Sequence, residues 1–144
     1  MPVLDLARED VITVERDAEV SEISETMNDE RVGSVVVVED GAPVGIVTDR
    51  TIALAVGQED DVSSLVAEDL MSEDPETVAA DTGAYELATA FGDAKVRRLP
   101  VVDDEGQLEG IVSLDDVIAT SAEELEEAAK VIEEQSPGYA SDER

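Results

Sequence analysis

The chain has 144 residues, with 38 Asp or Glu against 9 Lys or Arg, so its formal net charge at pH 7 is −29. It contains no Cys and no His, which excludes disulfide bonds, thiolate nucleophiles, Ser-His-Asp triads and His-ligated metal sites. Hydrophobic residues make up 42% of the chain, as in a globular domain, and the excess of acids argues against nucleic acid binding, which depends on Lys and Arg.

The acidity itself has two explanations. The protein either binds a basic partner or mimics nucleic acid, or it has a solvated surface suited to a salt-rich cytoplasm, where at 1 M salt the Debye length is about 3 Å. The acids are spread along the chain and Lys occurs only at positions 95 and 130, which favours the second explanation. No apolar run approaches the roughly 20 residues of a membrane span, and Met1–Asp10 lacks the apolar core of a secretion signal, so we expect a cytoplasmic protein without a membrane partner.

Residues 1–60 predict one β-α-β-β-α unit. Val-rich runs suit buried strands, an Asp-Gly pair between two of them suits a hairpin turn, and apolar residues three or four apart (Val20, Ile23 and Met27) predict the core face of a helix. The expected elements, in chain order, are a strand (Val11–Val14), a helix that begins at Asp17, a hairpin (Val35–Val38 and Val44–Val47, with a turn at Glu39–Gly41) and a helix that begins near Asp49.

Residues 61–120 predict a second copy of this unit. Similar residues recur at a constant spacing of 64, as between Asp5 and Asp69, until the extra residue Glu105 lengthens a turn and the spacing becomes 65. We expect a loop over Gly57–Ser64 and a short helix that ends near Leu70. The elements expected after it are a strand (Thr77–Val78), a helix that begins at Asp81–Thr82 with an apolar stripe of Ala84, Leu87 and Phe91, a hairpin (Leu99–Val102 and Leu108–Val112) and a helix that begins near Leu114.

A separate helix is predicted over residues 121–135. Ser121–Glu124 fits a capping box, and Leu125, Ala128, Ala129 and Ile132 follow at helical spacing. We expect this stripe to pack against the body or a second subunit, and residues 136–144 to form a flexible tail.

The order of these motifs resembles a tandem pair of CBS domains, which are named after cystathionine β-synthase. Asp69–Pro75, Val96–Asp103 and Gly110–Val117 carry the resemblance, which covers about residues 1–120. It implies an α/β (α+β) fold in which two repeats pack as a pseudo-twofold pair and leave two clefts. It also implies a stand-alone regulatory homodimer that binds AMP, ADP, ATP or S-adenosylmethionine. From the acidic composition we expect the protein to come from a halophilic archaeon.

By this resemblance, Ser113 and Asp116 occupy the ribose-binding positions. An ionised carboxylate accepts hydrogen bonds from both vicinal ribose hydroxyls, and a nearby hydroxyl can donate or accept. The two residues are three apart at a strand-to-helix junction, so one helical turn can direct both at the same sugar. The alternative is that Asp116 is an ordinary exposed carboxylate at the start of a helix.

Arg97 and Arg98 stand where the family often places phosphate contacts, and the planar guanidinium donates two parallel hydrogen bonds to phosphate. The alternative is that the two arginines pair with neighbouring carboxylates. The two interpretations are compatible if a bound phosphate displaces the carboxylate from the arginine. In copy one, Thr51 replaces the ribose Asp and Thr48 is retained, so this second site is expected to be degenerate. The other assigned positions are Arg50, near phosphate in either cleft, and Thr13, Thr77 and Val78, near the base.

Three functions remain in competition. The first is a ligand-sensing module that signals to a separate effector protein, and the second is a scaffold or dimerisation module that has lost its ligand. The third function is that of an enzyme. It is not expected, because no motif of a nucleophile with a nearby base occurs. No protein-bound metal is expected because the carboxylates are diffuse, although Mg²⁺ can accompany bound ATP.

Overall fold

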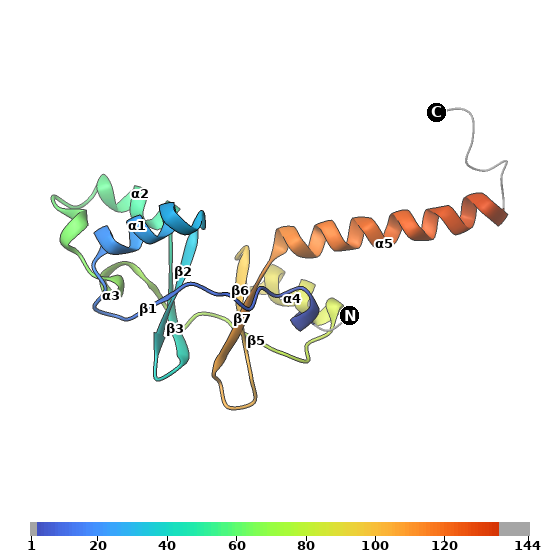
Figure 1. Ribbon diagram of the computed structural model, residues 1–144, viewed down its shortest axis with the longest axis horizontal. Helices are drawn as coiled ribbons and strands as arrows, with labels where there is room; N and C mark the ends of the chain where they lie inside the picture. Colours follow the sequence, from blue (N-terminus) through green and yellow to red (C-terminus); the bar gives the residue numbers. More distant parts are fainter. Residues whose placement is uncertain (1–2, 136–144) are drawn as a thin grey trace.

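The computed structural model describes residues 3–135, which form two copies of the predicted β-α-β-β-α unit, each with its own sheet (Figure 1). In each copy the first strand pairs in parallel with the second, and the second and third form an antiparallel hairpin. The first sheet has the order β1 (Thr13–Val14), β2 (Ser34–Glu39), β3 (Ala42–Thr48) and β4 (Ser72–Glu73). The second sheet has the order β5 (Val78–Ala79), β6 (Arg98–Val102) and β7 (Leu108–Ser113).

Helices complete both copies. No helix within the described residues 3–135 is long and apolar enough to cross a membrane. The helices are α1 (Val20–Glu30), α2 (Asp49–Val56), α3 (Ala67–Leu70), α4 (Ala84–Ala94) and α5 (Leu114–Gln135), with 3₁₀ turns at Val3–Asp5 and Val62–Ser64. The stripes predicted for α1 and α4 are confirmed at Met27 and Phe91, which lie in the two hydrophobic cores, whereas Ala84 is exposed.

Each copy begins with a segment, here called its lead-in (residues 3–12 and 62–77), that packs against the other copy. Val3 of the first lead-in lies in the core of copy two, whereas Ala67 and Met71 of the second lead-in lie in the core of copy one. The backbone of Arg8 exchanges hydrogen bonds with Ile111 of β7, at N···O distances of 2.8 and 3.0 Å. Gly110 allows this close approach, because a Cβ there would lie 2.8 Å from the Arg8 carbonyl oxygen. The exchange locks the copies together and brings the first lead-in beside the start of α5.

The helix starts predicted at Asp17 and Asp81–Thr82 are wrong, because the packing of each lead-in on the other copy changes how the helices begin. The N-caps are Glu19 and Gly83, and neither makes a side-chain capping bond. Residues just before each helix are instead bonded to the opposite lead-in: the Ala18 carbonyl accepts from Ala67 N at 2.8 Å, and the Thr82 carbonyl accepts from Val3 N at 2.9 Å. Tertiary hydrogen bonds therefore override the local capping preference.

The predicted break at Ser121 is also wrong. One helix, α5, runs without interruption from Leu114 to Gln135, so the Ser121–Glu124 capping box does not form. No Gly or Pro lies between these ends, and the segment is rich in Ala, Glu and Leu, which favour helix. Figure 1 shows the C-terminal part of α5 extending away from the two copies.

Replacing Gly106 by Ala should lower the free energy of unfolding by about 1 kcal/mol, because the Gly106 φ of +82° lies in the left-handed region. A Cβ there would meet no atom within 4 Å, so the cost is conformational alone. Gly92→Ala in α4, where a Cβ also meets open space, is the matched control and should raise the unfolding free energy by roughly 0.5–1 kcal/mol. Urea unfolding measures both, and changes of the same sign would contradict the account.

Candidate functional site

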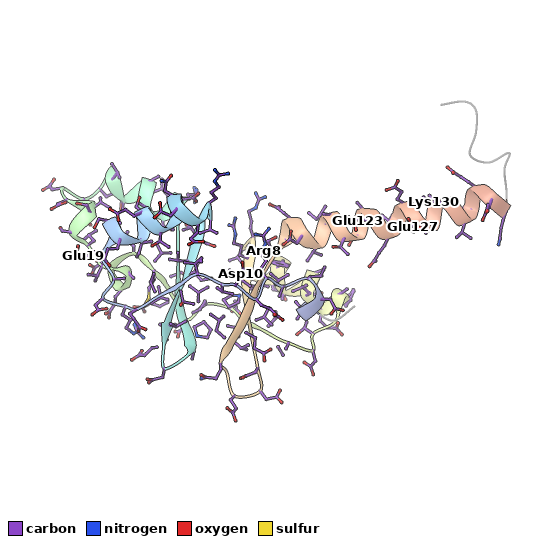
Figure 2. The ribbon with its side chains drawn as sticks, viewed as in Figure 1. Arg8, Asp10, Glu19, Glu123, Glu127 and Lys130 are labelled. Atoms are coloured by element: carbon purple, nitrogen blue, oxygen red, sulfur yellow. The ribbon has the colours of Figure 1, made fainter. Side chains whose placement is uncertain are left out.

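A pocket of about 350 Å³ lies between the two copies. Its walls come from four separated parts of the chain: the first lead-in, the end of α1 with the start of β2, the start of β6, and the β7–α5 junction. The lead-in residues Arg8 and Asp10 are marked where this segment crosses between the two sheets (Figure 2). The lining is Arg8, Asp10–Ile12, Glu30–Ser34, Arg98, Ile111, Ser113, Asp115 and Asp116.

The predicted ribose pair, Ser113 and Asp116, lies together in this wall. Both side chains are partly buried, and the Ser113 hydroxyl accepts a hydrogen bond from the Asp116 backbone N–H at 3.1 Å. Ser113 thereby caps the first turn of α5 and fixes where that turn presents Asp116. The carboxylate is left to accept hydrogen bonds from a ligand in the pocket.

Three Arg side chains line the same pocket. They are Arg8 on the lead-in, Arg31 at the end of α1 and Arg98 on β6. Arg31 has a left-handed backbone with φ of 56° and ends α1, with its N–H bonded to the Met27 carbonyl. None of the three forms an ion pair with any residue in the described range 3–135. Three of the nine basic residues therefore line one pocket, which they share with four acids, Asp10, Glu30, Asp115 and Asp116.

Arg97 differs from its neighbour Arg98. It does not line the pocket, its side chain is 73% exposed, and its guanidinium lies 2.8 Å from the Asp115 carboxylate. Of the two interpretations of the arginine pair, pairing with a neighbouring acid applies to Arg97, whereas Arg98 lies beside the predicted ribose pair. Arg97 directly precedes Arg98, the first residue of β6, and successive side chains of an extended chain point to opposite sides.

The remaining predicted residues lie outside the pocket lining. Arg50 is exposed on α2, Thr13 and Thr77 are exposed, and Val78 is 6% exposed within the core of copy two. In copy one the hydroxyls of Thr48 and Thr51 are 2.9 Å apart, and the Thr51 N–H donates to the Thr48 hydroxyl at 3.1 Å. These two hydroxyls thus bond to each other and supply no charge.

Two basic residues of the pocket, Arg8 and Arg31, escaped the sequence reasoning. The repeat spacing contained a signal for Arg31, because Arg31 is the counterpart of Lys95 and both end a helix in the left-handed conformation. Arg8 had no such signal, because its position follows from the exchange of lead-ins.

Basic side chains distinguish this pocket from a second hollow. The second hollow, lined by Ala80, Asp81, Asp103, Asp104 and Glu109, has only acids as its charged groups and would repel phosphate. Among residues 3–135 no group of three or more carboxylates is arranged to hold a metal ion. The first pocket therefore combines three Arg with the Ser113–Asp116 pair and an apolar wall.

Both copies match a known protein family. The CBS domain model matches residues 3–58 and 66–123. An uncharacterized protein of Methanopyrus kandleri is 38% identical over 116 residues, 79% of this chain and 59% of its own. The CBS domain-containing protein YhcV of Bacillus subtilis is 33% identical over 120 residues, 80% of this chain and 81% of YhcV. An inosine-5'-monophosphate dehydrogenase of Korarchaeum cryptofilum is 33% identical, but the chain spans only 22% of that enzyme.

Solved structures agree with the sequence relatives. The CBS-domain containing protein ATU1752 from Agrobacterium tumefaciens superposes with a TM-score of 0.75 at 28% identity, over 84% of this chain and 99% of its own. CBSX2 from Arabidopsis thaliana, in complex with AMP, superposes with a TM-score of 0.71 at 27% identity, over 85% and 96%. Because the family model covers both copies, and relatives and structures align along most of the chain, the chain belongs to the CBS domain family as a tandem pair.

Proposed function

We propose that the protein is a regulatory module that binds an adenosine-type ligand in the pocket between its two copies. The observation that carries the proposal is the convergence of Asp116, Ser113 and three Arg side chains on that pocket. Asp116 accepts hydrogen bonds from the ribose hydroxyls, and Arg8, Arg31 and Arg98 hold the phosphate. The volume of about 350 Å³ is within the usual range of small-ligand pockets, and CBSX2, a structural relative, is known in complex with AMP.

The base has an apolar surface to contact. Val11 and Ile12 of the lead-in, Val32 after α1 and Ile111 of β7 line the pocket with hydrocarbon. A flat aromatic base buries its faces on such side chains, while its edge hydrogen bonds to backbone groups. In this arrangement Thr13, next to Ile12, lies at the edge of the base region, and AMP, ADP, ATP with Mg²⁺ and S-adenosylmethionine share the adenosine part.

One molecule of ligand binds per chain. The copy-one counterpart of the ribose pair is Thr48 and Thr51, whose hydroxyls bond to each other. A Thr hydroxyl cannot replace a carboxylate that accepts from two ribose hydroxyls, so this position has no competent ribose site. Arg50 and Thr77 then have no role in ligand binding in this chain.

The ligand signal leaves through α5, since Ser113 caps that helix and Asp116 lies in its first turn. Ligand contacts made there favour one orientation of the helix, and a partner reads that orientation. We also infer a homodimer, because α2 and α4 expose apolar side chains, with Leu54 54%, Val56 64% and Tyr85 82% exposed.

A thermal-shift screen with AMP, ATP and S-adenosylmethionine separates this function from that of a scaffold without a ligand. A ligand that binds only the folded state raises the unfolding temperature, by an amount that grows with its concentration. We expect a rise with at least one of the three compounds. An unfolding temperature unchanged by all three would favour the scaffold.

The net charge of −29 is best explained as adaptation to a salt-rich cytoplasm, as in a halophilic archaeon. An anionic ligand is repelled by this background at low salt, and the repulsion is screened once the Debye length falls to about 10 Å near 0.1 M salt. AMP affinity should therefore rise as salt is first added, before the arginine contacts themselves weaken. A calorimetric series in NaCl that shows weakening from the lowest concentration onward would contradict this.

A further inference from the structure

The C-terminal part of α5, residues 121–135, is an unpartnered helix, here called the arm. Every residue of the arm is exposed in the structure, and Leu125, Val131 and Ile132 are large apolar side chains with exposed fractions of 71%, 53% and 51%. A helix of this length has marginal stability in water when nothing packs against it. The arm projects away from both copies (Figure 1), so a stabilising contact must come from outside the described residues 3–135.

The arm has one apolar stripe. At 3.6 residues per turn, Ala122, Leu125, Ala129 and Ile132 fall on one face, with Ala128 beside them. The small Ala residues between Leu125 and Ile132 allow the backbone of another helix to approach closely. Val131 is as exposed as Ile132 but lies off this face, about a third of a turn away.

Acidic residues border the stripe on both sides. Helical geometry places Glu124 along one edge and Glu126 and Glu133 along the other. Glu123, Glu127, Glu134 and Lys130 occupy the opposite face, where Lys130 pairs with Glu127 at 2.9 Å (Figure 2). The only base of the arm is thus turned away from the stripe and already paired.

The charges on these edges determine which kind of helix can pack against the stripe. When two amphipathic helices pair, the residues that border the two stripes face each other. In a pair of identical arms Glu would face Glu in the parallel and the antiparallel arrangement alike, which is destabilising. A helix whose stripe is bordered by Lys or Arg meets opposite charges along both edges.

We propose that the arm binds a helix of a partner protein that carries an apolar stripe bordered by Lys or Arg. The proposal rests on the stripe and its acidic edges and is independent of any ligand in the pocket.

The first test measures how tightly the full chain binds a fluorescent peptide of Leu and Lys in an amphipathic helical pattern. Binding is measured by fluorescence anisotropy at physiological salt. Ile132→Asp should weaken peptide binding about tenfold, because a charge replaces a buried apolar contact. Val131→Asp, with the same side chain at a position of similar exposure in the same helix, should leave binding within about twofold of wild type. Equal losses in the two variants would overturn the proposal.

The second test reverses charge on the edges. The triple variant Glu124→Lys/Glu126→Lys/Glu133→Lys should lose the Leu-Lys peptide and bind a matched Leu-Glu peptide instead. The triple variant Glu123→Lys/Glu127→Lys/Glu134→Lys has the same net charge and should keep the wild-type preference. If both triple variants behave alike, attraction is to overall charge and the proposal fails.

Sedimentation of wild type and Ile132→Asp tests the competing occupant, a second copy of this chain. Their masses should be equal. Dissociation of Ile132→Asp to a smaller species would overturn the proposal by showing that the arm is an interface between copies.

Discussion

Replacing Asp116 by Ala should weaken AMP binding by about 100-fold. The carboxylate is expected to accept hydrogen bonds from two ribose hydroxyls, and a hydrogen bond to a charged group contributes about 1.5–3 kcal/mol. Two such bonds together give ~3 kcal/mol, which corresponds to the expected factor of about 100. Calorimetric titration of the two proteins with AMP measures the difference.

Asp115→Ala is the matched control for Asp116→Ala. Asp115 also lines the pocket, but its carboxylate is 66% exposed and pairs with Arg97 on the surface. Removing it leaves the ribose contacts intact and takes away a negative charge near the phosphate, so AMP affinity should stay within about twofold of wild type or rise slightly. Equal losses in the two variants would mean that general disturbance of the α5 start, and not a ribose contact, causes the effect.

Replacing Arg98 by Ala should weaken binding of AMP at least tenfold while leaving binding of adenosine nearly unchanged. Arg98 lines the pocket without an ion pair in the described residues, so its guanidinium is available to the phosphate. Loss of a charge-assisted hydrogen bond of about 1.5–3 kcal/mol corresponds to a factor of roughly 10 to 100. The comparison of the two ligands assigns the loss to the phosphate.

The neighbouring substitution Arg97→Ala is the control, because Arg97 is exposed and bonded to Asp115 outside the pocket. It should change AMP affinity less than about threefold and stability by less than ~1 kcal/mol, as is usual for surface ion pairs. If Arg97→Ala weakens AMP binding more than Arg98→Ala, the phosphate lies on the other side of β6 and the assignment of the two arginines must be reversed.

The hairpins and their order could be predicted from sequence because their determinants are local. Val-rich runs flank an Asp-Gly turn in copy one, where Asp40 and Gly41 have φ of 51° and 82°, as a tight hairpin turn requires. The Ser113–Asp116 pair was predicted for a similar reason, since a spacing of three at a helix start fixes the relative positions of the two side chains. Resemblance to a family supplied the ribose role, and the structure places the pair at a pocket.

The exchange of lead-ins could not be predicted from local pattern. Val3 packs in the core of copy two, and Ala67 and Met71 in the core of copy one, through contacts between residues far apart in sequence. That exchange removed the expected caps at Asp17 and Asp81. It also brought Arg8 to the pocket, which is why Arg8 was not among the phosphate contacts predicted from the sequence, Arg50, Arg97 and Arg98.

The repeat relates single positions of the two copies. Thr51 stands where copy two has the ribose Asp, and Arg31 is the counterpart of Lys95. A pocket between two copies takes part of its wall from each, so the basic residue of one copy serves the carboxylate of the other. The relation between Arg31 and Asp116 therefore became visible only in the assembled pair.

One adenosine-type ligand is proposed to bind between the two copies. Calorimetric titration of the wild-type chain with AMP, ATP and S-adenosylmethionine tests this binding, because it gives affinity and stoichiometry together. At least one of the three compounds is expected to bind, with one molecule per chain. Absence of binding by all three, or two equivalent molecules per chain, would contradict it.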